Sequence, residues 1–215
     1  MAGSFADIAF TPGVQALQRK HGSRTQYARM QQHAQPAMLG ARERDFLEAA
    51  DSFYLATVGE TGWPYVQHRG GPRGFVRVLS PTAIAFADFR GNLQYVSAGN
   101  VAHDDRASLI VVDYANRRRL KLLGHLRFVD AADADAALAA TVALPGYRAT
   151  VERIAVVDVA AFDWNCPQHI TPRFTAAELA LRTRPLEARI AALEAELVDL
   201  RSGSGRPLAT GRVSR

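Results

Sequence analysis

Apolar and polar positions alternate through the middle of the chain, between about residues 52 and 162. The segments "SFYLATVG" and "ETGWPYVQHR" flank Gly59 to Gly62, which predicts a β-hairpin. "GFVRVLS" and "TAIAFADF" predict a second pair across Ser80-Pro81, and "SLIVVDY", "RLKLLGHLRFVD" and "VERIAVVDVAAF" predict three more long strands. About seven strands with few helices between them favour a mainly antiparallel barrel over a doubly wound sheet.

Helical patterns flank the predicted strands. One short helix is expected from Thr11-Pro12 to Gly22 and another from Ser23 to Met30. "ARERDFLEAA" places Phe46, Leu47 and Ala50 on one helical face, and the Ala-rich "AADADAALAATVAL" predicts a helix that covers the sheet. The expected fold class is therefore mainly β with flanking helices (α+β).

The C-terminal part has a different pattern. Thr175 and Glu178 have the spacing of a capping box, and Pro185 is expected to break the helix that they begin. Beyond the proline, apolar residues recur at alternating steps of four and three: Leu186, Ile190, Leu193, Leu197 and Leu200. This seam of about two heptads is too short to act alone as a coiled coil. It fits packing on its own domain and contact with another subunit equally well.

These patterns suggest one domain with appendages. An N-terminal helical segment is expected at 1–45, a barrel domain at 46–173, C-terminal helices at 174–202 and a disordered polar tail at 203–215. Hydrophobic residues make up 48% of the 215 residues and charged residues 22%, which is ordinary for a globular chain with a well-buried core.

The amino-acid composition also indicates the cellular compartment in which the protein is expected. The N-terminus lacks a basic start followed by an apolar run, and no stretch approaches the roughly 18 apolar residues of a membrane span. The single cysteine permits no intrachain disulfide, which agrees with a reducing environment. We expect a cytoplasmic protein without membrane contact.

The net charge of +5 raises the question of nucleic-acid binding. Many of the arginines lie near the two ends of the chain, where a solvated or disordered tail is the simpler interpretation. A denser set, Arg117, Arg118, Arg119 and Lys121, falls within a predicted strand region. A compact anion is a better partner for such a set than a duplex, and a nucleic-acid partner is not expected.

Several kinds of catalytic or binding site have no signal in the sequence. It contains neither GxGxxG nor GxxxxGK[ST], so no Rossmann or P-loop phosphate site is indicated. Cys166 and His169 are three residues apart, but no second ligand pair lies near them, and we expect no metal site. We interpret Cys166 as an inert, partly buried thiol.

Polar residues and glycines gather at predicted strand ends. Tyr65, Gln67 and Arg69 should share one strand face, opposite Val66 and His68, before the chain breaks at Gly70-Gly71. A turn at Arg90-Gly91-Asn92 leads to a possible helix start with Tyr95, Ser97, Gly99 and Asn100. Hydroxyls, amides and backbone N–H groups at a helix start, with arginines nearby, suit a phosphate. Together these residues favour a phosphorylated ligand.

The chain from about Phe46 to Arg173 resembles the pyridoxamine 5'-phosphate oxidase-like, FMN-binding split-barrel proteins, in particular an uncharacterised bacterial branch. Four stretches in the same order carry the resemblance: "WPYVQHRGGPRGF", "FADFRGNLQYVSAGN", "DYANRRRLKLLG" and "WNCPQHITPR". It implies an antiparallel split β-barrel and a homodimer with FMN at the subunit interface. It also implies phosphate and ribityl contacts from Arg69 and from the segment 90–100, and an approach of Arg119 and Lys121 across the interface.

The last stretch follows the final strand, where the family has a flavin-facing segment. The resemblance therefore implies that Trp164 packs near the flavin ring, with Asn165 and Gln168 at its polar edge. The full set of expected cofactor-binding residues is Gln67, His68, Arg69, Gly70, Arg90, Asn92, Tyr95, Ser97, Asn100, Arg119, Lys121, Trp164, Asn165 and Gln168.

The function that the resemblance implies is an FMN-dependent oxidoreductase acting on an unknown small molecule. A leucine-seamed helix and a basic tail stand where the vitamin B6 oxidase has a substrate-binding segment with Arg and His, so pyridoxamine phosphate is not the expected substrate. Two alternatives are a flavin-binding protein for storage or sensing, without turnover, and a basic module that binds nucleic acid. No catalytic residue is assigned.

Overall fold

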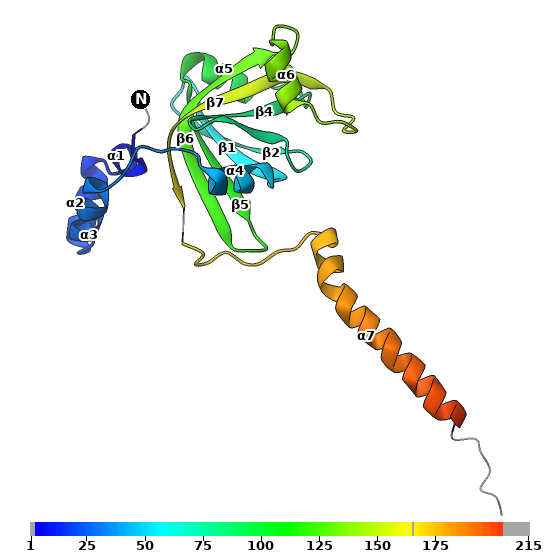
Figure 1. Ribbon diagram of the computed structural model, residues 1–215. Helices are drawn as coiled ribbons and strands as arrows, with labels where there is room; N and C mark the ends of the chain where they lie inside the picture. Colours follow the sequence, from blue (N-terminus) through cyan, green and yellow to red (C-terminus); the bar gives the residue numbers. More distant parts are fainter. Residues whose placement is uncertain (1–2, 165, 204–215) are drawn as a thin grey trace, which may run out of the picture. The chain divides into compact units, whose positions relative to one another are not determined.

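The computed structural model describes residues 3–164 and 166–203 (Figure 1). The chain divides into two compact units, with the division between Thr171 and Pro172. The first unit holds all the strands of the described residues, and the second holds the C-terminal helix. Asn165 and most of the expected polar tail lie outside the described residues.

Seven strands form one antiparallel sheet in the described part of the first unit. The order across the sheet is β2-β1-β5-β6-β7-β4-β3. The strands are β1 (Ser52–Val58), β2 (Pro64–Gly70), β3 (Val76–Ser80), β4 (Ala83–Phe89), β5 (Arg106–Asp113), β6 (Arg118–Asp130) and β7 (Val151–Trp164). Both expected strand pairs and the three longer strands are confirmed.

The sheet curls until its two ends share one core, as the ribbon in Figure 1 shows. Phe53 on β1 packs edge-on against Phe86 on β4, with ring centroids 5.0 Å apart. Phe53 also stacks on Phe75, which directly precedes β3, at 5.7 Å. Strands far apart in the sheet order therefore meet through their inward side chains. The fold is an antiparallel split β-barrel, as the sequence predicts.

A bulge lets the two longest strands follow this curvature. The register of β6 and β7 shifts between Leu123 and Gly124. A Cβ atom on Gly124 would lie 2.5 Å from the carbonyl oxygen of Asp158 and 2.8 Å from a Val157 methyl group. Only glycine allows the two backbones to approach so closely.

Short helices flank the barrel: α1 (Phe5–Ala9), α2 (Pro12–Lys20), α3 (Arg24–Gln32), α4 (Ala41–Glu48), α5 (Val96–His103) and α6 (Ala136–Val142). Thr11 caps α2 by accepting a hydrogen bond from the Val14 N–H, as expected. Ser23 precedes α3 but makes no side-chain cap. Phe46 and Leu47 of α4 are buried in the barrel core, and Ala50 packs beside them.

The Ala-rich segment forms a shorter helix than expected. Asp135 caps α6 by accepting a hydrogen bond from the Leu138 N–H at 2.8 Å, so the helix starts only after it. Val142 at its end is buried in a second, small cluster with Ile154 and Val156 of β7. The helix thus covers part of the sheet, as predicted.

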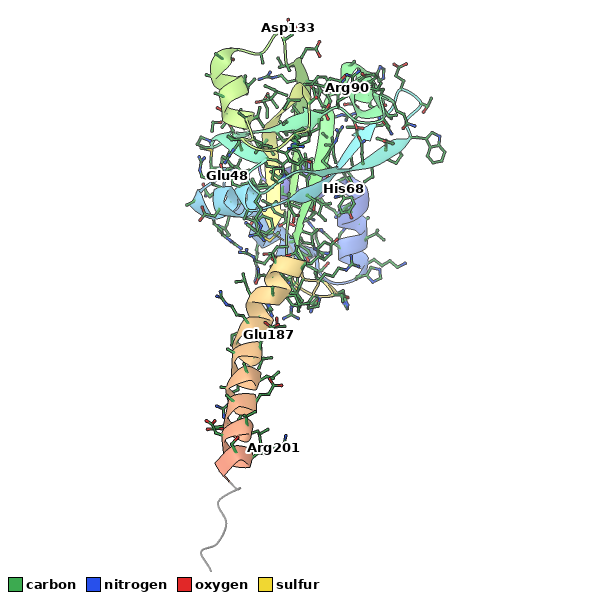
Figure 2. All side chains as sticks on the ribbon, turned by 90° about the vertical axis from the view of Figure 1, so that its right-hand side faces the viewer. Glu48, His68, Arg90, Asp133, Glu187 and Arg201 are labelled. Carbon is green, nitrogen blue, oxygen red and sulfur yellow. The ribbon has the colours of Figure 1, made fainter. Side chains whose placement is uncertain are left out.

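The second unit contains α7 (Ala176–Gly203). Thr175 and Glu178 form the expected capping box: Glu178 N–H donates to Thr175 Oγ1 at 3.2 Å and Thr175 N–H donates to Glu178 Oε2 at 2.9 Å. The expected break at Pro185 is wrong, because the helix continues through this residue. Alanine, leucine, glutamate and arginine surround the proline, and these strong helix formers favour continuation on both sides of it. Figure 2 shows Glu187 and Arg201 projecting from this helix.

Within residues 3–164 and 166–203, none of the helices combines the length and the apolar character that crossing a membrane requires.

Candidate functional site

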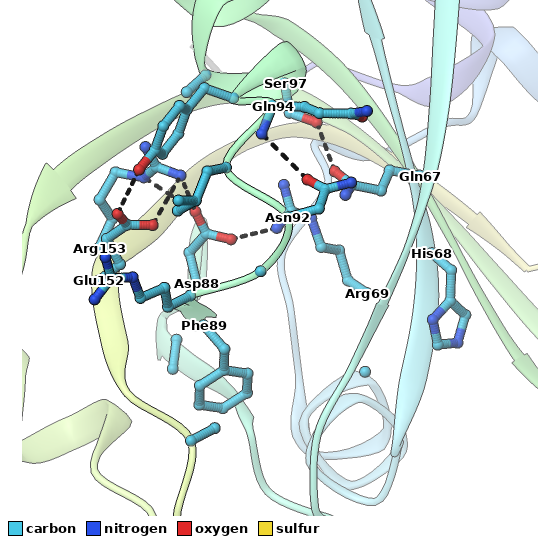
Figure 3. A pocket seen from close by; sticks show the side chains of 18 of the residues that line it. Gln67, His68, Arg69, Asp88, Phe89, Asn92, Gln94, Ser97, Glu152 and Arg153 are labelled. Carbon is cyan, nitrogen blue, oxygen red and sulfur yellow. Dashed lines mark hydrogen bonds and ion pairs between the residues drawn. The ribbon is translucent and has the colours of Figure 1, made fainter.

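A cavity of about 430 Å³ lies where the end of β2 faces the end of β4 (Figure 3). The segment between β4 and α5 and the start of β7 complete its wall. The structure brings together these expected cofactor-binding residues around it: Gln67, His68, Arg69, Gly70, Arg90, Asn92, Tyr95 and Ser97. The residues lie on separate elements, so barrel closure is what assembles them.

The alternation of β2 places its polar side chains on the cavity side. Tyr65, Gln67 and Arg69 are partly buried, whereas Val66 and His68 are more exposed. This agrees with the expected division between the two strand faces, although His68 also reaches the cavity wall. The ring of His68 packs edge-on against Tyr54 of β1, with centroids 5.7 Å apart.

Asp88 is the charged centre of the wall. Its side chain is 1% exposed and lies between two arginines that are each 16% exposed. Nη1 of Arg69 donates a hydrogen bond to Oδ1 of Asp88. Nε and Nη2 of Arg153 donate to Oδ2 at 3.0 and 2.8 Å. One buried carboxylate thus balances one of the two guanidinium groups, and Oε2 of Glu152 lies 3.9 Å from Nη2 of Arg153.

Arg69 has hydrogen-bonding capacity beyond this ion pair. Its Nε is buried, and no acceptor contacts it in the part of the chain that the structure describes. A buried N–H without a partner is destabilising, so the hydrogen bonds of this side chain are incomplete among the described residues. Figure 3 shows Arg69 and Arg153 converging on Asp88 from opposite sides.

The start of α5 contributes further donors. The first N–H groups of an α-helix have no partner within the helix, and they carry the positive end of its dipole. Ser97 in the first turn is buried, and its Oγ donates to Oε1 of Gln67 at 3.1 Å. Arg90 adds an exposed guanidinium to the cavity wall. These groups suit an anionic ligand.

Tyr95 links the helix start to β7. It precedes α5 with a left-handed backbone (φ 54°), and its hydroxyl donates to Oε1 of Glu152 at 2.7 Å. This hydrogen bond raises the pKa of Tyr95 above its usual value. The guanidinium of Arg153 lies 4.8 Å from the centroid of the tyrosine ring. Tyr95 therefore connects the turn to the charged cluster.

The sequence reasoning missed Asp88, Glu152 and Arg153. A signal was present for Asp88, since a carboxylate in the otherwise apolar strand "AIAFADF" is rarely buried without a cationic partner. The partners themselves could not be read from the sequence. Arg153 is 65 residues from Asp88, and their contact depends on the pairing of β4 with β7.

Other expected site residues lie away from this cavity within the single chain. Asn100 donates from Nδ2 to the buried Thr57 Oγ1 at 3.0 Å. Lys121 pairs with Asp163 at 3.3 Å. Arg119 lies on β6, where its buried Nε has no hydrogen-bond partner among the described residues.

The end of β7 and the segment after it also lie elsewhere. Nε1 of Trp164 donates to Oε1 of Glu43 at 2.8 Å, and its ring packs edge-on against Phe46 with centroids 4.7 Å apart. Gln168 is exposed, and Asn165 lies outside the described residues. The interpretation of Cys166 as a partly buried thiol is wrong, because it follows the last strand and is exposed.

Comparison with solved structures gives distant matches. HupZ from Group A Streptococcus is 14% identical with a TM-score of 0.47, and the match covers 64% of this chain and all of that one. An FMN-binding protein from Syntrophomonas wolfei is 11% identical with a TM-score of 0.42, and the match covers 69% and 97% of the two chains. An F420 reductase is 21% identical with a TM-score of 0.41, and the match covers 56% and 94%. No curated protein sequence matches this one.

Comparison with protein families gives a direct assignment and confirms the resemblance seen in the sequence. The family model described as pyridoxamine 5'-phosphate oxidase matches residues 39–161, a region that runs from just before α4 into β7 and includes the whole charged cluster. Because the match covers more than half of the 215 residues, the chain belongs to the pyridoxamine 5'-phosphate oxidase family.

Proposed function

We propose that the cavity between β2, β4 and α5 binds the phosphate and ribityl part of FMN, and that the protein is an FMN-dependent oxidoreductase. Membership in the pyridoxamine 5'-phosphate oxidase family supports flavin binding. A volume of about 430 Å³ lies within the usual range of small-molecule sites, about 300–1,000 Å³.

The observation that carries the proposal is the unsatisfied Nε of Arg69, buried in the wall of this cavity. Asp88 already occupies Nη1 of the same guanidinium, so it fixes the group without satisfying its remaining donors. A phosphate oxygen can accept from a guanidinium held in this way, in a charge-assisted hydrogen bond.

The charge balance of the wall agrees with a phosphate. Arg69, Arg90 and Arg153 face two carboxylates, Asp88 and Glu152, and the helix start of α5 adds N–H donors. A phosphate of about two negative charges would therefore complete a site that is otherwise positive. Asp88 acts as a positioning residue in this arrangement, because its contacts are to the two arginines.

The residues that lie away from the cavity suggest a second half of the site. Arg119 on β6 carries the other buried Nε without a partner among the described residues. We assign Arg119, Lys121 and the segment after Trp164 to the flavin held mainly by a second copy of the chain. In this homodimer each subunit contributes the start of β6 to its partner's cavity, so a single chain presents two incomplete halves.

Bound FMN would supply hydride or electron transfer, while the protein supplies binding and orientation. Arg69, Arg90 and the start of α5 would anchor the phosphate end, which leaves the ring end toward the subunit interface. The substrate is a small molecule that approaches the ring there.

Release and mass spectrometry of the cofactor from the purified protein test this proposal. FMN in near-stoichiometric amount supports it, whereas FAD, or no binding after reconstitution with FMN, contradicts it. Steady-state oxidation of reduced nicotinamide with oxygen or a quinone then separates an enzyme from a flavin-binding protein without turnover. Tight binding of DNA at high salt without flavin would instead favour the nucleic-acid alternative.

A further inference from the structure

α7 carries a leucine at every seventh residue over its whole length. These are Leu179, Leu186, Leu193 and Leu200, which are between 39% and 65% exposed in the single chain. The continuation of the helix through Pro185 brings Leu179 into line with the three leucines beyond it. The apolar seam therefore runs from Leu179 to Leu200, one heptad longer than the seam that begins beyond Pro185.

A second row completes the heptad pattern. With the leucines at position d, position a holds Thr183, Ile190 and Leu197, and Ala176 at the helix start. Thr183 and Ile190 are β-branched, and β-branched residues at a with leucine at d favour two-stranded coiled coils. Pro185 falls at position c, away from the seam, so its missing N–H and its ring do not disturb the apolar rows.

The residues beside the seam have complementary charges. Position g holds Arg182, Arg189 and Glu196, and position e of the following heptads holds Glu187, Glu194 and Arg201. In a parallel, in-register pair each g residue faces the e residue five positions later on the other helix. All three contacts, 182 with 187, 189 with 194 and 196 with 201, then join opposite charges.

We propose that α7 forms a parallel, in-register, two-stranded coiled coil with α7 of a second copy of this chain. The charges favour a second copy of α7 as the binding partner, because every g residue of one copy meets an opposite charge at e of the other. An antiparallel pair would bring e next to e′ and g next to g′ instead, and a centred pair would then place glutamate against glutamate at e. Arg182 stacks on Phe174 at 4.1 Å in the single chain, so the contacts of Arg189 and Glu196 should carry most of the electrostatic preference.

This inference is independent of flavin binding, since it uses only residues of the second unit. The barrel and the helix could each associate without the other. A test must therefore report on the helix itself and not only on the mass of the particle.

Disulfide trapping in the full-length chain gives that report. Cys166→Ser removes the exposed native thiol, and Thr183→Cys or Leu197→Cys then places one cysteine at an a position near either end of the seam. In a parallel pair each cysteine lies beside its own copy, within reach of a disulfide. Ala188→Cys, at the outward position f of the same helix, is the matched control. Both a-position variants should form covalent dimers at least about tenfold faster than this control.

Two results would overturn the proposal. Equal rates at 183, 197 and 188 would mean that the seam does not pair and is covered by the chain's own barrel or by another protein. Cross-linking only in mixtures of the Thr183→Cys and Leu197→Cys chains would mean an antiparallel pair. The flavin content of each variant, measured alongside, separates any failure of the flavin site from failure of the coiled coil.

Charge reversal tests the assigned contacts. In the Cys166→Ser, Thr183→Cys background, one chain carries Arg182→Glu, Arg189→Glu and Glu196→Arg, and a second carries Glu187→Arg, Glu194→Arg and Arg201→Glu. Each alone faces like charges and should cross-link several-fold more slowly than the parent. The mixture restores every opposite pair and should give mainly heterodimers. Equal homodimer and heterodimer formation would refute the pairing.

Discussion

Arg69 on β2 donates a hydrogen bond to Asp88 on β4, although β2 is the first strand of the sheet and β4 the last but one. The contact exists because the sheet curls on itself, and it joins the two walls of the candidate cavity. Arg153 on the neighbouring β7 reaches the same carboxylate. The fold and the candidate site are thus connected through a buried ion cluster.

Replacing Arg69 tests the proposed phosphate contact. Loss of a charge-assisted hydrogen bond costs about 1.5–3 kcal/mol, so Arg69→Ala should weaken FMN binding by at least about tenfold. Arg69→Lys should recover only part of the loss, because an ammonium cannot pair with Asp88 and a phosphate in the same geometry. Titration of FMN into the apo proteins measures this. Arg127→Ala, on the exposed face of β6, serves as the control and should bind like the parent.

Replacing Asp88 tests its positioning role. Asp88→Asn leaves two arginines with like charges and no buried counter-charge, which costs about 3–5 kcal/mol in other proteins when one partner is removed. For a chain of this length the midpoint of thermal unfolding should fall by on the order of 10 °C. Asp130→Asn, at an exposed position, is the matched control. An unchanged midpoint for Asp88→Asn would mean that the cluster does not stabilise the barrel.

Bound phosphate should reduce the cost of losing Asp88. The anion can balance the two arginines that the substitution leaves unpaired, so FMN should raise the unfolding midpoint of Asp88→Asn more than that of the parent at saturating FMN. Equal stabilisation of both proteins would indicate that the flavin phosphate binds away from the arginines.

The hydrogen bond from Tyr95 to Glu152 predicts a pH dependence at high pH. Because it raises the pKa of Tyr95 in the folded state, its contribution to stability is fully present below the unfolded pKa of about 10. The contribution is lost as the pH rises through the folded pKa. Phenolate absorbance should therefore show one tyrosine that titrates late, and Tyr95→Phe or Glu152→Gln should remove that late step. A titration curve unchanged by either substitution would contradict the assignment.

Gly124 should tolerate no side chain. A Cβ at this position would lie 2.5 Å from the Asp158 carbonyl oxygen, which is backbone and cannot move aside freely. Gly124→Ala should destabilise the protein by about 1–3 kcal/mol, measured by denaturant unfolding. Gly13→Ala in α2 is the control, since its Cβ would meet nothing within 4 Å and should stabilise the helix slightly. Equal stability of the two variants would mean that β6 and β7 can separate at the bulge.

The strands and their order of appearance could be predicted from the sequence because period-two alternation and turn residues are local signals. The seven polar residues and Gly70 around the cavity could be predicted for the same reason, since they lie at strand ends and at a helix start. Asp88 with Arg153 could not be predicted, because their contact depends on strand register. Trp164 shows another limit: its indole N–H bonds to Glu43, which is 121 residues earlier in the chain.

Pro185 shows how a local rule can fail. A proline inside a helix costs about 3 kcal/mol, which favours an end to the helix when the residue is considered alone. The helix around it contains alanine, leucine, glutamate and arginine over 28 residues, and the proline occupies a position away from the leucine row. The length of the seam was therefore underestimated from the sequence.

The most direct test of flavin-phosphate binding in this cavity is the FMN affinity of the parent protein compared with Arg69→Ala, measured by flavin fluorescence titration of the apo proteins. We expect the parent to bind FMN and Arg69→Ala to bind it at least about tenfold more weakly while keeping its fold by circular dichroism. A parent that does not bind FMN, or equal affinities of the two folded proteins, would contradict the assignment of the cavity to the flavin phosphate.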